Sequence, residues 1–315
     1  NFSKHEFKGP DARKFLDHIM AGKLPKPGRI SLTPMLTYRG KLYGDLTVAC
    51  FNENDFMVFG SGAAQEMHRR WFESHIDKFN VNYKNRSDDF HGLSISGPKS
   101  RELLQKIVRE DVSNSKFKFR DSRRMYVAGV PAVINRLSFT GELGYEIYVA
   151  PHYQIKLYEE LMEAGKEFNI KPFGSRALMS MRLEKNWGAW TLDYRPDFTP
   201  KETGLDAFIN WDKDFIGKNS AQKDESKNKI IPLIVETNEI DVTYNEAVMK
   251  GEKSIGYITS GGFAHFVNKS VAFSYLDTKE LNSGKGIQVE INGDMFNCSI
   301  IKEPLYDPSG QKMRS

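Results

Sequence analysis

The chain has 315 residues, enough for two or three domains, and its 39% hydrophobic and 27% charged residues are those of an ordinary soluble protein. Its 45 basic and 41 acidic residues are interspersed, whereas a nucleic-acid-binding protein needs a concentrated basic face. No window approaches the roughly 18 apolar residues of a membrane span, so we expect neither nucleic acid nor a membrane as a partner.

The two cysteines, Cys50 and Cys298, lie far apart in the sequence and have no metal-ligand spacing around them. We therefore expect free thiols in a reducing compartment, which is the cytoplasm or, as an alternative, the mitochondrial matrix. The sequence begins at Asn1 without a methionine, so we expect a fragment or a processed form.

The first third of the chain predicts a βαββαβ succession. Strands are expected at 5–8, 30–36, 40–50 and 55–59, helices at 10–20 and 63–78, and a polar connection at 83–90. A strand, Gly-Pro and helix pattern at 5–20 returns at 93–104, which suggests two related modules.

The middle of the chain predicts a second α+β unit, and the end predicts an all-β unit. The middle strands are expected at 124–128, 133–138 and 145–149, followed by helices at 152–168 and 175–185. A polar linker at 222–229 leads to short strands separated by turn residues, at 230–235, 255–260, 271–276, 287–291 and 295–301. These strands indicate a small barrel or sandwich.

Most catalytic signatures are absent from the sequence. It contains no dinucleotide fingerprint, phosphate loop, nucleophile elbow or zinc-protease motif. His68 and His75 could share a helix face, but further ligands cannot be placed, so we predict surface histidines and no metal site.

Two carboxylates on strands remain as candidates. Asp45 lies at a turn-to-strand junction, where Leu46 and Val48 define the apolar face. In an alternating strand, Glu146 shares a face with Tyr148 and not with its neighbour Tyr145. From these segments alone, solvent exposure is the favoured explanation for both carboxylates.

An ordered set of motifs connects these residues to a known family. The motifs are Thr-Pro-Met-Leu at 33–36, Gly-Asp-Leu-Thr-Val at 44–48, Ser-Phe-Thr-Gly-Glu-Leu-Gly-Tyr-Glu at 138–146, Arg-Leu-Glu-Lys at 182–185, Thr-Pro-Lys-Glu-Thr-Gly-Leu at 199–205, Asp-Phe-Ile-Gly-Lys at 214–218, Thr-Ser-Gly-Gly at 259–262 and Glu-Pro-Leu-Tyr-Asp-Pro at 303–308. The chain thereby resembles the aminomethyltransferase family, the T-protein of the glycine cleavage system. It is most similar to the C-terminal folate-binding region of dimethylglycine and sarcosine dehydrogenases.

The resemblance implies an α+β fold with three domains in a cloverleaf around bound tetrahydrofolate. Two ferredoxin-like α+β folate-binding domains are expected, 1–103 with Asp45 and 104–220 with Glu146, followed by a C-terminal β-barrel at 221–315. Asp45 matches the catalytic aspartate near N10 of the folate, and Glu146 matches the glutamate that binds the pterin ring. Further folate contacts are expected from Phe139, Tyr145, Thr47, Met35 and Leu36, although the segment 33–36 fits hydrophobic packing equally well.

Two positions depart from the family pattern. Phe139 stands where the oxidase relatives often have tyrosine, and Leu178 stands where T-protein has an arginine. The second departure favours the dehydrogenase-like branch over the aminomethyl-lipoyl substrate of T-protein.

The resemblance therefore implies tetrahydrofolate-dependent one-carbon transfer, forming 5,10-methylenetetrahydrofolate from a methylamine-derived iminium. The amine-derived substrate would be oxidised by FAD on a missing flavin dehydrogenase domain or a separate subunit, since this sequence has no FAD fingerprint. Alternatives are a folate-dependent demethylase that forms 5-methyltetrahydrofolate and a non-catalytic folate-binding module. Such a module would resemble the iron–sulfur assembly proteins of the same fold, whose Lys-Gly-Cys-Tyr-x-Gly-Gln-Glu motif is absent here.

Overall fold

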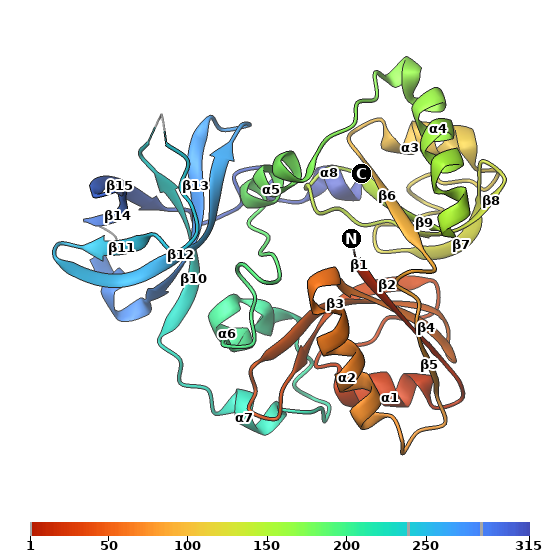
Figure 1. Cartoon of the computed structure of the whole chain (residues 1–315), viewed down its shortest axis with the longest axis horizontal. Helices are drawn as coiled ribbons and strands as arrows, with labels where there is room; N and C mark the ends of the chain where they lie inside the picture. Colours follow the sequence, from red (N-terminus) through yellow and green to blue (C-terminus); the bar gives the residue numbers. More distant parts are fainter. Residues whose placement is uncertain (1, 238–239, 284–285) are drawn as a thin grey trace.

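The computed structural model describes residues 2–237, 240–283 and 286–315. The chain forms three lobes, two built on open sheets and one on a closed barrel (Figure 1). The predicted order of α+β, α+β and all-β units is confirmed. In the described ranges, no helix has the length and apolar character needed to cross a membrane.

The first sheet has five strands in the order β2-β3-β4-β1-β5. Its elements are β1 (Phe2–Lys8), α1 (Ala12–Ile19), β2 (Arg29–Leu36), β3 (Leu42–Asn52), β4 (Asp55–Ser61), α2 (Gln65–His75) and β5 (Asn82–Asn85). Helix α1 forms where sequence spacing places Phe15, Leu16 and Ile19 on one buried stripe. Strand β5 corrects the predicted polar connection, because Tyr83 packs against Phe7 with ring centroids 5.1 Å apart.

The second sheet has four strands in the order β6-β9-β8-β7. Its elements are β6 (His91–Ser96), α3 (Ser100–Ile107), β7 (Ser122–Val127), β8 (Val130–Asn135), β9 (Gly144–Val149) and α4 (Gln154–Gly165). The predicted boundary between residues 103 and 104 falls inside α3, whose Leu103 and Leu104 are buried in the core of this second sheet. We therefore propose that the first domain ends between β5 and β6.

The two sheets pack against each other through a small apolar seam, which joins strands β2, β3 and β4 to β8 and β9. Its buried members are Ile30, Ala49, Met57, Phe59, Val133 and Tyr148. Phe59 and Tyr148 lie at its centre, with ring centroids 4.8 Å apart. The first two lobes are thus joined by side chains from both sheets.

The connection to the third lobe is built on α5 (Ser175–Glu184), α6 (Pro200–Thr203) and α7 (Lys218–Gln222). Short 3₁₀ turns occur along the chain at η1 (Gly62–Ala64), η2 (Pro151–Tyr153), η3 (Lys166–Phe168), η4 (Leu205–Phe208) and η5 (Thr278–Ser283). Helix α6 begins with a capping box, in which Thr199 and Glu202 satisfy each other's backbone N–H groups.

A buried ion pair fixes the loop that follows α5. Arg182, at the end of α5, donates to Asp193 at 2.6 Å, and the two side chains are 1% and 0% exposed. Asp193 also accepts from the hydroxyls of Thr259 and Ser260 on the barrel, at 2.5 and 2.7 Å. Because the carboxylate is fully hydrogen-bonded, it joins α5, the loop and the barrel without an unpaired buried charge.

The third lobe is a closed six-stranded barrel in the order β10-β13-β12-β11-β14-β15. Its strands are β10 (Asn228–Val235), β11 (Ala247–Lys250), β12 (Lys253–Ala264), β13 (Lys269–Asp277), β14 (Ile287–Ile291) and β15 (Asp294–Ile300). The closure confirms the C-terminal barrel implied by the family resemblance and excludes the sandwich that the strand pattern alone left open. Strand β11 was not predicted, and its pairing with β14 helps to close the barrel.

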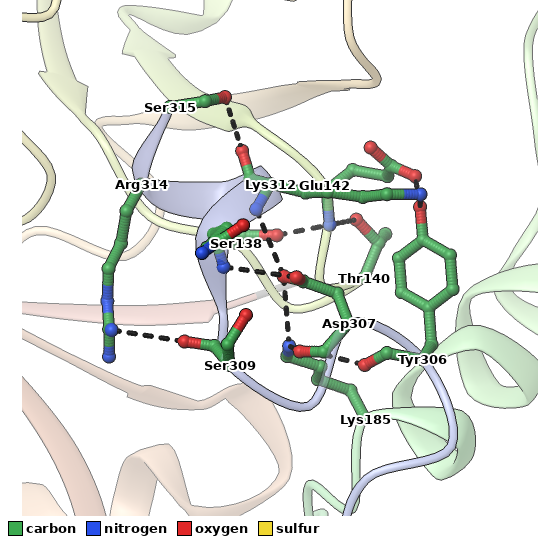
Figure 2. A network of polar contacts seen from close by, with 11 residues as sticks. Ser138, Thr140, Glu142, Lys185, Tyr306, Asp307, Ser309, Lys312, Arg314 and Ser315 are labelled. Carbon is green, nitrogen blue, oxygen red and sulfur yellow. Dashed lines mark hydrogen bonds and ion pairs between the residues drawn. The ribbon is translucent and has the colours of Figure 1, made fainter.

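The segment after the barrel returns to the second lobe and ends in α8 (Gln311–Arg314). Figure 2 shows its contacts. The Tyr306 hydroxyl donates to Glu142, and Lys312 approaches that hydroxyl at 2.6 Å. The Lys185 ammonium lies 3.3 Å from an Asp307 carboxylate oxygen. This network connects the turn before β9 with α5 and the C-terminal segment.

Replacing Asp193 by alanine is expected to lower the free energy of unfolding by about 3–5 kcal/mol, because it leaves the Arg182 charge buried without its partner. Urea denaturation measures this loss. The matched control is Asp197→Ala, which removes an exposed carboxylate from the same loop and is expected to cost less than about 1 kcal/mol. Equal losses in the two variants would show that the buried pair does not hold the loop.

Candidate functional site

Asp45 lies on β3, and strand alternation decides which way it points. Leu46, Val48 and Cys50 are fully buried in the core of the first sheet, so Asp45 and Thr47 lie on the opposite face. Both residues are partly buried. Burial raises the pKa of Asp45 to about 7, because a low-dielectric environment disfavours the ionised form. A carboxyl group with that pKa can exchange a proton near neutral pH.

Tyr194 lies near Asp45, in the loop fixed by Asp193. Burial raises the pKa of the Tyr194 hydroxyl, and the negative charge of Asp45 raises it further. The ring is held closely against Gly188, where an added Cβ would lie only 2.3 Å from the Tyr194 Cζ atom. The sequence did not single out Tyr194, because its segment lacks periodicity and only the tertiary fold brings it to β3.

Glu146 lies on β9, on the same face as Tyr148, as alternation predicts. The Tyr148 hydroxyl donates to Glu146 at 2.9 Å. Burial raises the pKa of Glu146, while the hydrogen bond from Tyr148 and the proximity of the Asn135 side chain lower it. The Asn135 amide nitrogen is buried and has no hydrogen-bond partner among the described residues. This part of the site therefore has unused donor and acceptor capacity.

The seam between the sheets connects the surroundings of the two carboxylates. Thr47, two residues from Asp45 on the same face, pairs across the sheet with Phe59. Phe59 packs against Tyr148, which is hydrogen-bonded to Glu146. Asp45 and Glu146 therefore lie on the faces of two different sheets that pack against each other.

Three of the predicted folate-binding residues are fully buried. Tyr145 is 0% exposed in the core of the second sheet, on the face opposite to Glu146, and stacks on Phe117 with ring centroids 5.8 Å apart. Met35 is 0% exposed in the core of the first sheet. Leu36 is also fully buried, in the cluster beside Trp190. The burial of Met35 and Leu36 favours the packing alternative for 33–36.

Phe139 is positioned differently from these three. It is partly buried, and its ring centroid lies 6.1 Å from that of Trp187, which comes from the loop after α5. Two flat side chains from distant segments are thus close together, with part of their surface accessible. Such a pair can pack against a planar ligand.

The prediction for the histidines needs one correction. His68 is 0% exposed rather than on the surface, with a ring nitrogen 2.9 Å from the Tyr43 carbonyl oxygen, and burial lowers its pKa to about 4. His75 is only partly buried. Across residues 2–237, 240–283 and 286–315, no group of three or more His, Cys, Asp or Glu side chains could hold a metal ion.

Comparison with protein families matches residues 1–213 to the GCVT N-terminal domain and residues 228–307 to the glycine cleavage T-protein C-terminal barrel domain. The chain is 35% identical over 312 residues to human mitochondrial dimethylglycine dehydrogenase, covering 96% of this chain and 36% of that protein. It is 30% identical over 312 residues to an aminomethyltransferase of Thermoanaerobacter pseudethanolicus, covering 97% of this chain and 84% of that protein.

Among solved structures, the glycine cleavage system aminomethyltransferase T from Bartonella henselae matches 98% of this chain and 84% of its own, with a TM-score of 0.87 and 21% identity. That likeness shows the same fold. The chain spans 36% of the length of the dimethylglycine dehydrogenases that it matches. The match over residues 1–213 and the bacterial aminomethyltransferase identity show that the chain belongs to the aminomethyltransferase (glycine cleavage T-protein) family.

Proposed function

We propose that this chain transfers a one-carbon unit from a methylamine-derived iminium to tetrahydrofolate and forms 5,10-methylenetetrahydrofolate. Aminomethyltransferases use tetrahydrofolate. The observation that supports the proposal most is the pair of partly buried carboxyl groups, Asp45 and Glu146, on two packed sheets. Burial raises the pKa of both, as is common at sites that bind or move protons.

The residues around Glu146 fit a pterin ring. A pterin presents a row of N–H and amino donors, and a carboxylate can accept two of them in parallel. Glu146 has only the Tyr148 hydroxyl as a direct hydrogen-bond partner among the described residues, which leaves acceptor capacity for such a ring. The unpaired Asn135 amide adds a donor, and Phe139 with Trp187 adds apolar surface for a flat ring.

Asp45 is suited to managing charge and protons. Bound tetrahydrofolate would supply the two amine nitrogens between which the carbon is finally held. The ionised Asp45 carboxylate stabilises positive charge on the incoming iminium, and one of its oxygens takes up the proton released as a nitrogen forms its new bond. With a pKa of about 7, this group can take up that proton near neutral pH and return it to the donor nitrogen, which leaves as a free amine when its bond to the transferred carbon breaks.

The electrophile is proposed to come from a flavin dehydrogenase domain or subunit. The chain matches only 36% of proteins named dimethylglycine dehydrogenase, so the oxidising part of such a protein lies outside the matched region. Leu178 replaces the arginine expected for T-protein, which favours a dimethylglycine- or sarcosine-type donor. The compartment of this chain stays a prediction.

Replacing Asp45 by asparagine is expected to lower the transfer rate about 10²- to 10⁴-fold, the usual range for a lost general acid or base, while folate affinity is largely kept. Formation of 5,10-methylenetetrahydrofolate from a supplied iminium measures the rate, and calorimetry measures the affinity. Asp214→Asn changes a fully exposed carboxylate and is the matched control. Unchanged turnover in Asp45→Asn would remove the catalytic role, and a 5-methyltetrahydrofolate product would favour the demethylase alternative.

Replacing Glu146 by alanine is expected to weaken folate binding by about 1.5–3 kcal/mol, the range for a hydrogen bond to a charged group. Isothermal calorimetry at fixed pH and salt gives the affinity. Glu160→Ala, on the exposed face of α4, is the matched control and should bind folate normally. Equal affinities for Glu146→Ala and the wild type would rule out the pterin contact.

The raised pKa of Asp45 predicts how stability changes with pH. From about pH 4 to 7 the carboxyl group is ionised in the unfolded chain but still protonated in the folded chain, so the folded state binds more protons. The free energy of unfolding of the wild type therefore falls as the pH rises through this range. The free energy of unfolding of Asp45→Asn should fall less over the same range. Urea titrations between pH 4.5 and 8 test the difference, and parallel curves would contradict the raised pKa.

A further inference from the structure

A cavity of about 210 Å³ lies between the loop after α5, helix α6 and the barrel. In Figure 1, α6 lies below the barrel, where the chain enters β10. Three apolar residues, Ile230, Phe273 and Ile301, contribute to its barrel side. Phe273 and Ile301 are buried, so this side of the cavity is firmly packed.

The opposite wall contains an unused hydrogen-bond acceptor. The Asn186 side-chain oxygen is buried and has no partner within the described part of the chain. Leaving a buried acceptor unpaired costs about 1–3 kcal/mol, so such a group is commonly satisfied by a ligand or water. Asn186 adopts a left-handed conformation with φ of 58°, and its backbone N–H donates to the Leu183 carbonyl at 3.0 Å, which fixes it at the end of α5.

A positive charge stands at the same cavity. Lys302 lines it and is exposed, and its ammonium forms no ion pair with any described residue. Lysine beside an apolar wall is suited to a small anion such as a carboxylate. The cavity thus combines a cation, an unpaired carbonyl oxygen and apolar surface within a volume suited to a small molecule.

Tyr194 connects this cavity with the candidate catalytic site. It lines the cavity together with Gly188, against which its ring is tightly packed. The same residue lies close enough to Asp45 for that carboxylate to raise the pKa of its hydroxyl. The apolar cluster that Tyr194 packs against also includes Leu32 on β2 and Leu42 on β3, the strand that carries Asp45.

We propose that this cavity binds the amine-derived donor as an N-methylated amino acid zwitterion. The carboxylate of this ligand pairs with Lys302. Its positively charged nitrogen faces the Asn186 oxygen and, when that nitrogen is protonated, donates a hydrogen bond to the oxygen. Its methyl group packs on Phe273 and Ile301. This proposal rests on the proposed function, because it assigns a donor site to the same reaction and places Tyr194 between donor and Asp45.

Binding of N,N-dimethylglycine, a stable saturated analogue of such an iminium, tests the proposal on the full chain. Ligand-observed NMR titration is expected to show binding that Lys302→Met weakens at least tenfold. Asn186→Gly keeps the left-handed backbone and is expected to weaken it about five- to tenfold, for one lost hydrogen bond. Both variants should keep the wild-type folate affinity, which also confirms that they fold.

Matched controls separate this site from nonspecific charge effects. Lys229→Met removes another exposed lysine of the third lobe and should leave dimethylglycine binding unchanged. Two probes that each lack one charge, 3,3-dimethylbutanoate and tetramethylammonium, should bind at least tenfold more weakly than dimethylglycine.

Two results would overturn the donor site: dimethylglycine that does not bind, or that binds equally to the wild type, Lys302→Met and Asn186→Gly. The proposed function would stand in either case if folate binds and Asp45→Asn lowers the transfer rate as expected. If the wild type neither binds folate nor forms methylenetetrahydrofolate, the proposed function fails whatever this cavity binds.

Discussion

The packing of Phe59 against Tyr148 is the contact on which the candidate site depends. Side chains alternate along a strand, so a residue fixed at the seam between two sheets also fixes the direction of its neighbours two positions away. Tyr148 fixes the direction of the Glu146 side chain in this way. The pairing of Phe59 with Thr47 likewise fixes the direction of Thr47 and of Asp45. The seam therefore brings together the sheet faces that carry the two carboxyl groups, where we propose a common site.

This arrangement has an electrostatic consequence. Burying a carboxyl group disfavours its charge, and both Asp45 and Glu146 have their pKa raised by burial. The nearby loop is instead held by Asp193, whose carboxylate is fully paired with Arg182 and barrel hydroxyls. The fully paired buried carboxylate, Asp193, thus has a structural role. The carboxyl groups that can accept further hydrogen bonds, Asp45 and Glu146, lie where a ligand is proposed.

Local patterns predicted the features that depend on local spacing. Alternation identified the buried face of β3 and the shared face of Glu146 and Tyr148, and turn residues identified most barrel strands. The family resemblance correctly indicated the three-lobed fold but not the full burial of Tyr145, Met35 and Leu36, because a motif match does not say which side of a strand faces the core. Strand β5, barrel closure, the burial of His68 and the approach of Tyr194 depend on distant pairings that no window of sequence contains.

A crystal structure of the chain with bound 5-formyltetrahydrofolate tests the central claim most directly. We expect the pterin N–H groups to donate to the Glu146 carboxylate and the N10 end of the folate to face Asp45, with the ring near Phe139. Folate bound elsewhere on the molecule, with neither carboxyl group in contact with it, would exclude Asp45 and Glu146 from the folate site.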